Sequence, residues 1–461
     1  FQRRELWRQR DANVLRKGKS RRANSVHCVV CVKLNRLFAI LAWSDDDDLM
    51  TAGSKSECKV STKCGDAVID RGVQIRRNEN FHKDYYSIRK PSYNNPMKVL
   101  YDARWILIEN RFDGVSRYTH ELAHAMAARD DLEMAWLIHD KRQLDKLPKG
   151  EYLLANKPEN FLAETFTLAR KITRAGYTLV YSPFFVMGTL GKRYKLVLTI
   201  HDMIYFTHRT PPQWFPWYIR LGWRLFHLTY WPMRWQLNHA DIVATVSETA
   251  RQELIDAHAT KRPIITVANA VNANFADPTP HPHYKSKSFV YMGAFTPYKN
   301  VECLIDALAL LPDMTLHLCG KMPPVRRPVL EQRMRDRGVF DRVVIYDGAT
   351  DEQYKQALSE ARCSISASRL EGFGLPLLEA QQRGLPFIAA DTPIFHEIGK
   401  DSVLYFDPNS PEAAAECIRR FADQKLSEDY IARGLVNITR YTWTNSATAA
   451  AKVCDRIDTH S

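Results

Sequence analysis

The chain has 461 residues, which is enough for two or three domains with sizeable cores. Its composition, with 45% hydrophobic and 25% charged residues, is that of a soluble globular protein. The net charge of +13 lies mostly in residues 1–96, which hold 20 Lys/Arg and 11 Asp/Glu and leave only +4 for the rest. The charge therefore does not indicate a nucleic-acid-binding body, and we expect no nucleic-acid partner.

Residues 1–96 show no sustained helical or strand periodicity, and we expect a disordered extension or sequence foreign to the native protein. They include Cys28 and Cys31, whose spacing could begin a zinc site, but the only further pair, Cys58 and Cys64, fits zinc poorly. The five later cysteines follow no pairing pattern, which favours a reducing compartment. No stretch of 18 apolar residues occurs, so we predict no transmembrane helix and a cytoplasmic location.

From Met97 onward, short β-rich apolar runs alternate with helical patterns. The strands predicted in the first half are 98–101, 134–138, 178–181, 195–200, 242–246 and 264–267. Those predicted in the second half are 289–292, 315–318, 343–346, 363–366, 387–390 and 403–406. Such alternation predicts parallel sheets built from right-handed crossovers. We therefore predict an α/β fold of two Rossmann-like, doubly wound parallel-sheet domains that face a ligand-binding cleft.

The domain boundaries follow from the same reading of the chain. Residues 97–275 and 288–428 are expected to form the two domains, joined by a Pro/Ser/Lys-rich linker at 276–287. Residues 429–461 are expected to form a C-terminal helix that packs back toward the N-terminal domain.

An aromatic and basic stretch stands out within the first predicted domain. Five of the ten tryptophans fall between residues 214 and 235, together with Arg220, Arg224 and Arg234. Trp and Arg together suit a membrane interface, and they also suit stacking on an acceptor sugar. A glycine and two prolines interrupt any long amphipathic helix here, and most of these aromatics are expected to pack the helices of the domain. Peripheral membrane contact through 214–235, at the inner face, stays open as an alternative.

The segment SRLEGFGLPLLEA, residues 368–380, directly follows the predicted strand 363–366. Its glycines let the backbone turn tightly and bring N–H groups close to a ligand, and the helix that follows aims its positive end at a diphosphate. Glu379 can accept hydrogen bonds from ribose hydroxyls, and Glu371 from those of a sugar. Taken alone, the pattern fits equally well a plain glycine turn before a helix whose dipole favours a glutamate.

The segment resembles the Glu-x7-Glu signature of the retaining glycosyltransferases of family 4, which have the two-domain GT-B fold. Other blocks similar to the family occur in the expected order: TIHD (199–202), VSE (246–248), YMGAFTPYKN (291–300), HEIG (396–399) and YFDP (405–408). The Glu-Gly-Phe-Gly-Leu-Pro sequence is most similar to that of the mannosyl- and rhamnosyltransferases of bacterial surface polysaccharide synthesis, and mannosyltransferases are the first choice. The resemblance covers essentially all of 97–461 and none of 1–96.

The resemblance implies that 97–275 is the acceptor-side domain and that 288–428 binds the nucleotide sugar. Lys299 would neutralise the donor diphosphate, and His201 would line the reaction centre beside the donor sugar. The alternative for His201 is a strand-end histidine that only bonds the backbone. The resemblance thus implies three catalytic residues, His201, Lys299 and Glu371. It implies a donor-binding set of Gly114, Gly293, Lys299, Glu371, Gly372, Phe373, Gly374 and Glu379.

One departure from the family pattern concerns charge at the diphosphate. The family often has an arginine just after the glycine of the YMG block, and this chain has Ala294 there, so another Arg or Lys must help Lys299. The one Asp-x-Asp pattern, Asp45–Asp48, lies outside the predicted fold, which argues against the metal-dependent single-domain class. We expect no metal and no cofactor beyond the nucleotide-sugar co-substrate.

The sequence therefore favours a retaining glycosyltransferase that moves a sugar, best guess mannose from GDP-mannose, to a glycan or lipid-linked acceptor. Because no carboxylate nucleophile can be identified, we favour front-face attack in which the departing phosphate takes the acceptor's proton. Two alternatives stay open: a sugar-nucleotide epimerase of similar two-domain fold, and a non-catalytic protein that binds a nucleotide sugar or a nucleic acid.

Overall fold

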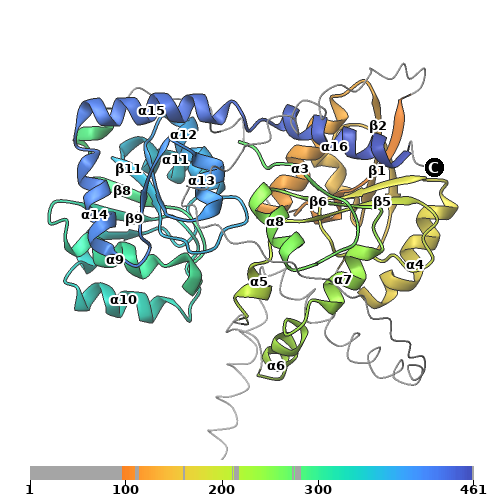
Figure 1. The fold of residues 1–461 in the computed structure, drawn as a ribbon, viewed down its shortest axis with the longest axis horizontal. Coiled ribbons are helices and arrows are strands. Elements are labelled where there is room, and N and C mark those ends of the chain that lie inside the picture. The colour runs from red at the N-terminus through yellow and green to blue at the C-terminus, as the bar shows by residue number, and fades with distance from the viewer. Residues whose placement is uncertain are drawn as a thin grey trace, which may run out of the picture.

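The computed structural model of the chain describes residues 96–108, 114–158, 161–209, 211, 217–271, 275 and 282–458. The expectations for residues 1–95, including the cysteine pairs, lie outside this part of the chain. Figure 1 shows two α/β domains side by side, the N-terminal one running from orange to green and the C-terminal one from green to blue.

The N-terminal domain is built on a seven-stranded parallel sheet with the order β3-β2-β1-β4-β5-β6-β7. Its strands are β1 Met97–Asp102, β2 Leu132–Ile138, β3 Glu151–Leu154, β4 Leu179–Ser182, β5 Lys195–Ile200, β6 Ile242–Thr245 and β7 Ile264–Thr266. The central strands are runs of buried residues because helices cover both faces of the sheet. Sequence reasoning missed β3, a four-residue edge strand whose side chains are largely exposed.

The C-terminal domain is built on a six-stranded parallel sheet with the order β10-β9-β8-β11-β12-β13. Its strands are β8 Ser288–Tyr291, β9 Thr315–Leu318, β10 Val343–Ile345, β11 Cys363–Ser366, β12 Phe387–Ala390 and β13 Val403–Phe406. All six coincide with predicted strands to within a residue at either end. Two parallel-sheet α/β domains, as the alternating pattern predicted, are thus confirmed.

Helices cover both sheets. Those of the N-terminal domain are α3 Gly114–Ala127, α4 Phe161–Arg174, α5 Ile204–Thr207, α6 Trp217–Phe226, α7 Trp231–Asn238 and α8 Glu248–Asp256. Those of the C-terminal domain are α9 Val301–Ala309, α10 Arg327–Asp336, α11 Asp351–Glu360, α12 Leu375–Gln382, α13 Pro393–Gly399 and α14 Pro411–Arg420. Two further helices, α15 Gln424–Ile438 and α16 Trp443–Asp458, end the described chain.

The end of the chain crosses from the second domain to the first (Figure 1). Helix α15 still packs in the C-terminal domain, where Asn437 Nδ2 donates to Gln381 Oε1 of α12 at 2.8 Å. Helix α16 lies on the N-terminal domain, and Ser446 Oγ donates to Ala268 O at 2.6 Å. The crossing therefore falls between Ile438 and Trp443.

Candidate active site

The loop after β11 carries the Glu-x7-Glu segment, and it turns into α12 as the sequence indicated. Gly374 precedes the helix with φ of +92°, a left-handed conformation that favours glycine. Pro376 lies in the first turn of α12, where a missing N–H leaves no hydrogen bond unmade. Glu371 thus lies before the helix, and Glu379 is its fifth residue, one turn further in than the positive end.

The same loop touches the N-terminal domain. A Cβ placed on Gly372 would lie 3.1 Å from both His201 O and Asp202 Cβ, which follow β5. Ser247, which follows β6 and caps α8, donates from Oγ to Gly372 O at 3.1 Å. Residues beyond the carboxyl ends of strands in both sheets therefore meet at this loop, the place where ligands bind in open parallel sheets.

His201 is held between the backbone and an aromatic ring. Its Nε2 lies 2.9 Å from Pro183 O, and its ring makes an edge contact with Tyr118 at a centroid distance of 4.9 Å. His201 therefore does bond the backbone, as the alternative interpretation of this residue expected. Its place beside Gly372 still puts it at the meeting point of the two domains.

Lys299 and Glu371 form an ion pair. Lys299 ends a short 3-10 turn after β8, and its Nζ lies 2.6 Å from Glu371 Oε1, with both side chains 14% exposed. Burial lowers the pKa of Lys299, but the Glu371 carboxylate, together with Tyr298 and Asp202, outweighs burial and holds that pKa above its usual range. Lys299 is therefore a cation at any working pH, placed next to the carboxylate expected to hold the sugar.

Glu379 is paired with a cation from the other domain. Arg117, in the first turns of α3, lies with Nη1 at 2.7 Å from Glu379 Oε1. Burial raises the pKa of Glu379, and the Arg117 guanidinium works against that shift. Sequence reasoning did not single out Arg117, because nothing local indicates which residue of the second domain it meets.

A second contact between the domains involves Glu397 of the HEIG block and the start of α8. Glu397 Oε1 accepts from Glu248 N at 2.8 Å, and Oε2 accepts from Thr249 N at 2.7 Å and Thr249 Oγ1 at 2.6 Å. A carboxylate at a helix N-terminus satisfies free N–H groups and complements the helix dipole. Glu397 therefore ties α13 of one domain to α8 of the other.

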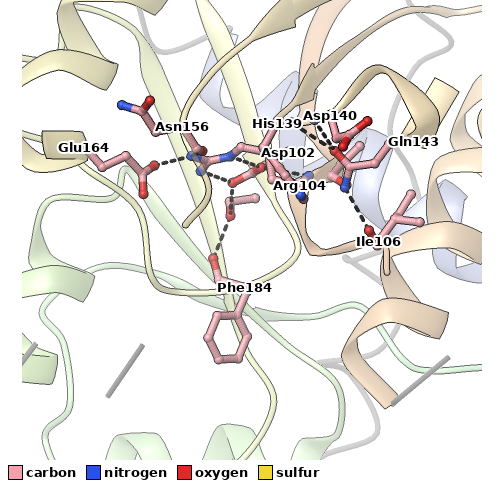
Figure 2. A network of polar contacts seen from close by, with 11 residues as sticks. Asp102, Arg104, Ile106, His139, Asp140, Gln143, Asn156, Glu164 and Phe184 are labelled. Carbon is pink, nitrogen blue, oxygen red and sulfur yellow. Dashed lines mark hydrogen bonds and ion pairs between the residues drawn. The ribbon is translucent and has the colours of Figure 1, made fainter. Parts of the chain in front are cut away.

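A buried polar network supports the carboxyl edge of the first sheet, as Figure 2 shows. Arg104 donates from Nε and Nη2 to the two oxygens of Asp102 at 2.7 Å each, and from Nη1 to Glu164 Oε1. Burial raises the pKa of Glu164 to about 7, although Arg104 opposes the shift. The network joins β1, the segment after it and α4 beneath the expected acceptor side.

The remaining predicted residues lie at turns of the two sheets. Gly114 is the first residue of α3, and Gly293 follows β8. A Cβ on Gly320, which follows β9, would lie 1.8 Å from Gly293 O, so these two strand ends touch and leave no room for a side chain at Gly320. Phe373 is buried against Tyr441, with ring centroids 5.6 Å apart.

The described part of the chain holds neither a metal-binding cluster nor a membrane-spanning helix. Within that part of the chain, no three His, Cys, Asp or Glu side chains come together as a metal ion would require. None of its helices is both long and apolar enough to span a bilayer.

Comparisons with known proteins decide the family. The description "Glycosyltransferase Family 4" matches residues 112–275, and "Glycosyl transferases group 1" matches residues 276–435. The chain belongs to the family 4 glycosyltransferases. The predicted resemblance is thereby confirmed, and a transferase is favoured over the epimerase and non-catalytic alternatives.

Individual relatives of this glycosyltransferase agree with the family. O-antigen chain mannosyltransferase B of Escherichia coli is 26% identical over 376 residues, covering 73% of this chain and 94% of that protein. A GDP-mannose:cellobiosyl-diphosphopolyprenol alpha-mannosyltransferase of Xanthomonas oryzae pv. oryzae is 27% identical over 169 residues, 34% of this chain and 43% of that one. Sucrose-phosphate synthase from Thermosynechococcus elongatus has a similar fold, with a TM-score of 0.62, 17% identity, and 79% and 100% coverage. The GT-B fold predicted from the sequence is thus confirmed.

Proposed function

We propose that this glycosyltransferase moves mannose from GDP-mannose to a glycan or lipid-linked glycan, with retention of configuration and without a metal ion. The observation that carries the proposal is that the Glu371–Gly374 loop meets residues 201–202 of the other domain, with Lys299 paired to Glu371 in that loop. Glu379, further along in α12, meets the other domain at Arg117.

The donor would lie along the loop and the first turns of α12. Glu371 would hold sugar hydroxyls, the amides of Phe373 and Gly374 would meet the phosphate, and Glu379 would accept from ribose. In the described structure Glu371 and Glu379 are each paired with a cation, Lys299 and Arg117 respectively. Donor binding would therefore redistribute existing ion pairs, and would not leave isolated buried charges.

Breaking the sugar–phosphate bond places negative charge on the departing diphosphate. The positive end of α12 and the protonated Lys299 would stabilise that charge, so no divalent ion is required by the chemistry. Positive charge grows on the sugar ring at the same time. Asp202, which packs against Gly372 and helps to hold the pKa of Lys299 high, would stabilise it electrostatically.

We assign front-face attack to the transfer step. The acceptor oxygen forms a bond to the anomeric carbon on the face that the phosphate leaves, and the departing phosphate oxygen takes the acceptor's proton. His201 would line this face of the sugar. Its Nε2 is oriented by Pro183 O, which fixes the ring beside the Gly372 loop.

The choice of mannose is supported by two relatives that are mannosyltransferases, one of them named for GDP-mannose and a diphosphopolyprenol-linked acceptor. We propose the same donor and an acceptor of that chemical class for this chain. Such an acceptor implies action at the cytoplasmic face of a membrane, where nucleotide sugars and lipid-linked glycans are both within reach.

The full chain should be tested by thermal shift and by donor hydrolysis with GDP-mannose, GDP-glucose, UDP-glucose and dTDP-rhamnose. We expect GDP-mannose to give the largest thermal shift and detectable slow hydrolysis to mannose with retained α-configuration, read by NMR. A larger response to a UDP or dTDP sugar would contradict the choice of donor. Release of β-mannose would contradict retention.

A further inference from the structure

The α6–α7 region of the N-terminal domain combines basic charge with apolar surface. Between Asp202 and Asp241 the chain has no acidic residue, whereas it has four arginines, at positions 209, 220, 224 and 234. Helix α6 lies at the periphery of the domain, away from its sheet (Figure 1). None of the catalytic roles proposed above uses this region.

One side of α6 presents large apolar side chains to solvent. These residues form an apolar stripe of Trp217, Leu221, Leu225, Leu228 and Trp231, whose exposed fractions lie between 51% and 76%. The first three recur every four residues, so they share one face of the helix. Surfaces of this kind are rare on soluble proteins unless they meet a partner.

The opposite side of α6 already packs against the domain. Trp223 is buried, and its ring makes an edge contact with Tyr205 at 5.2 Å and a tilted contact with His227 at 4.2 Å. Trp223 therefore packs the domain as expected for the aromatics of this stretch, whereas Trp217 is 76% and Trp231 51% exposed. Helix α6 thus has one buried apolar face and one exposed apolar face.

Cations continue from the apolar stripe into a basic pocket. Arg234 lies one turn after Trp231 on α7, so the two side chains share a face. The pocket beside it, of about 730 Å³, is lined by Arg234, Arg251, Lys261 and Arg262, with no Asp or Glu among its described lining residues. Such a pocket fits an anionic headgroup.

We propose that the apolar stripe of α6 and the start of α7 bind the surface of an anionic phospholipid bilayer, with the surrounding arginines and the basic pocket facing its phosphates. Trp and Leu would enter the boundary between headgroups and acyl chains while the arginines stay at headgroup level. Two short helices lie along this boundary as readily as one long helix. This inference rests on the proposed function in one respect only, since a lipid-linked acceptor would place the enzyme at such a surface.

The charge pattern favours lipid over a second copy of the chain. A two-fold dimer through the apolar stripe would bring the same arginines toward each other, with no acidic residue between Asp202 and Asp241 to pair with them. An anionic bilayer supplies the opposite charge over the whole surface, and its attraction weakens with salt.

The test is co-sedimentation of the full chain with vesicles, without any sugar nucleotide, so that its outcome does not depend on the donor. Vesicles of phosphatidylcholine with 30% phosphatidylglycerol, roughly the range in which such binding is measured, are compared with pure phosphatidylcholine at low and high salt. We expect binding to the anionic vesicles alone, with a loss of about tenfold or more in L221Q/L225Q and in R220Q/R224Q. V436Q, at an equally exposed apolar position of α15, is the matched control and should bind as wild type.

Thermal unfolding shows whether each variant is folded, and light scattering on a sizing column reports its oligomeric state. Equal binding of the α6 variants and wild type would overturn the proposal and assign binding to another region, such as residues 1–95. No binding to anionic vesicles, or equal binding to neutral ones, would overturn it as well. A wild-type dimer that L221Q/L225Q makes monomeric would show that a second copy covers the apolar stripe.

Discussion

Arg117 of the first domain and Glu379 of the second form an ion pair of 2.7 Å between residues 262 positions apart. The carboxylate in that pair is the one that the family pattern assigns to the ribose. If Glu379 binds the ribose, the pair would join donor binding to the relative placement of the two domains. Arg117 would then be a candidate for the additional cation that Ala294 makes necessary.

Removing the guanidinium should make nucleotide binding depend on pH. Burial already raises the pKa of Glu379, and Arg117 opposes that shift, so Arg117→Ala should raise the pKa further. A protonated Glu379 accepts ribose hydrogen bonds less well, so the variant should bind GDP more weakly than wild type, and its affinity should fall further as the pH is lowered. Calorimetry of GDP at pH 6 and pH 8 checks this.

Arg142→Ala is the matched control, because Arg142 is an exposed arginine of the same domain that pairs only locally, with Asp140. It should bind GDP as wild type does. An Arg117→Ala protein with unchanged affinity at both pH values would show that the pair does not bear on the nucleotide.

Glu379→Ala tests the ribose contact directly. Loss of charge-assisted hydrogen bonds should weaken GDP binding by about 1.5–3 kcal/mol, or roughly 10- to 150-fold. Arg117 then becomes the unpaired group, but it is half-buried and can turn to solvent or to Asp351, 3.9 Å away. Unchanged affinity in calorimetry would mean that ribose lies elsewhere.

Glu397 should affect turnover more than donor affinity. Its three hydrogen bonds to residues 248–249 tie the domains together, whereas all the proposed donor contacts except Gly114 lie in the second domain. Glu397→Ala should therefore lower kcat about tenfold or more while changing the donor KM by less than threefold. Glu248→Gln is the control, because that side chain lies at the same helix end without bonding Glu397. Equal losses in kcat and in donor affinity would contradict this division.

Lys299 and a chelator together test the source of charge stabilisation. Activity should survive EDTA, whereas Lys299→Ala should lose about 10²–10³ in kcat, the usual effect of removing one group that stabilises a developing oxyanion. Lys299→Arg should recover part of the rate, and Lys425→Ala, an exposed lysine on α15, should behave as wild type. Loss of activity in EDTA with rescue by magnesium or manganese would contradict the metal-free proposal. A Lys299→Ala enzyme within a few fold of wild type would contradict the role of the lysine.

Much of the fold could be predicted because parallel strands covered on both faces are continuous apolar runs. The one strand that was missed, β3, lies at the edge of the sheet. Its side chains are mostly exposed, so packing in the core does not require a buried apolar pattern there. The loop and helix around Glu371 and Glu379 could be predicted because all their parts are adjacent in the chain.

The partners across the domain interface could not be predicted from one sequence. Arg117 and Glu397 are ordinary helical residues until the packing of the two domains brings Glu379 and α8 to them. The exposure of Trp217 and Trp231 could not be predicted either, because the sequence alone does not distinguish a buried tryptophan from an exposed one.

The buried Arg104 network gives a prediction on stability. The pKa of Glu164 is raised from 4.5 to about 7 in the folded protein, so between these values the folded state binds a proton that the unfolded state has released. Folded-state stability therefore falls as pH rises through this window, and it changes little from this group below pH 4.5 or above pH 7. A shift of this size corresponds to on the order of 3 kcal/mol.

Glu164→Gln removes the ionisation while keeping a group that can still accept from Arg104 Nη1. The difference in melting temperature, variant minus wild type, should increase by a few degrees from pH 5 to pH 8. The reason is that only the wild type must bury a charged carboxylate at the higher pH. Differential scanning calorimetry at four pH values checks this, with Glu416→Gln, an exposed carboxyl on α14, as the control. If the difference between Glu164→Gln and wild type is the same at every pH, Glu164 does not titrate in this window. If the variant is less stable at pH 8 in particular, the ionised Glu164–Arg104 pair is the stabilising state, and the direction argued here is wrong.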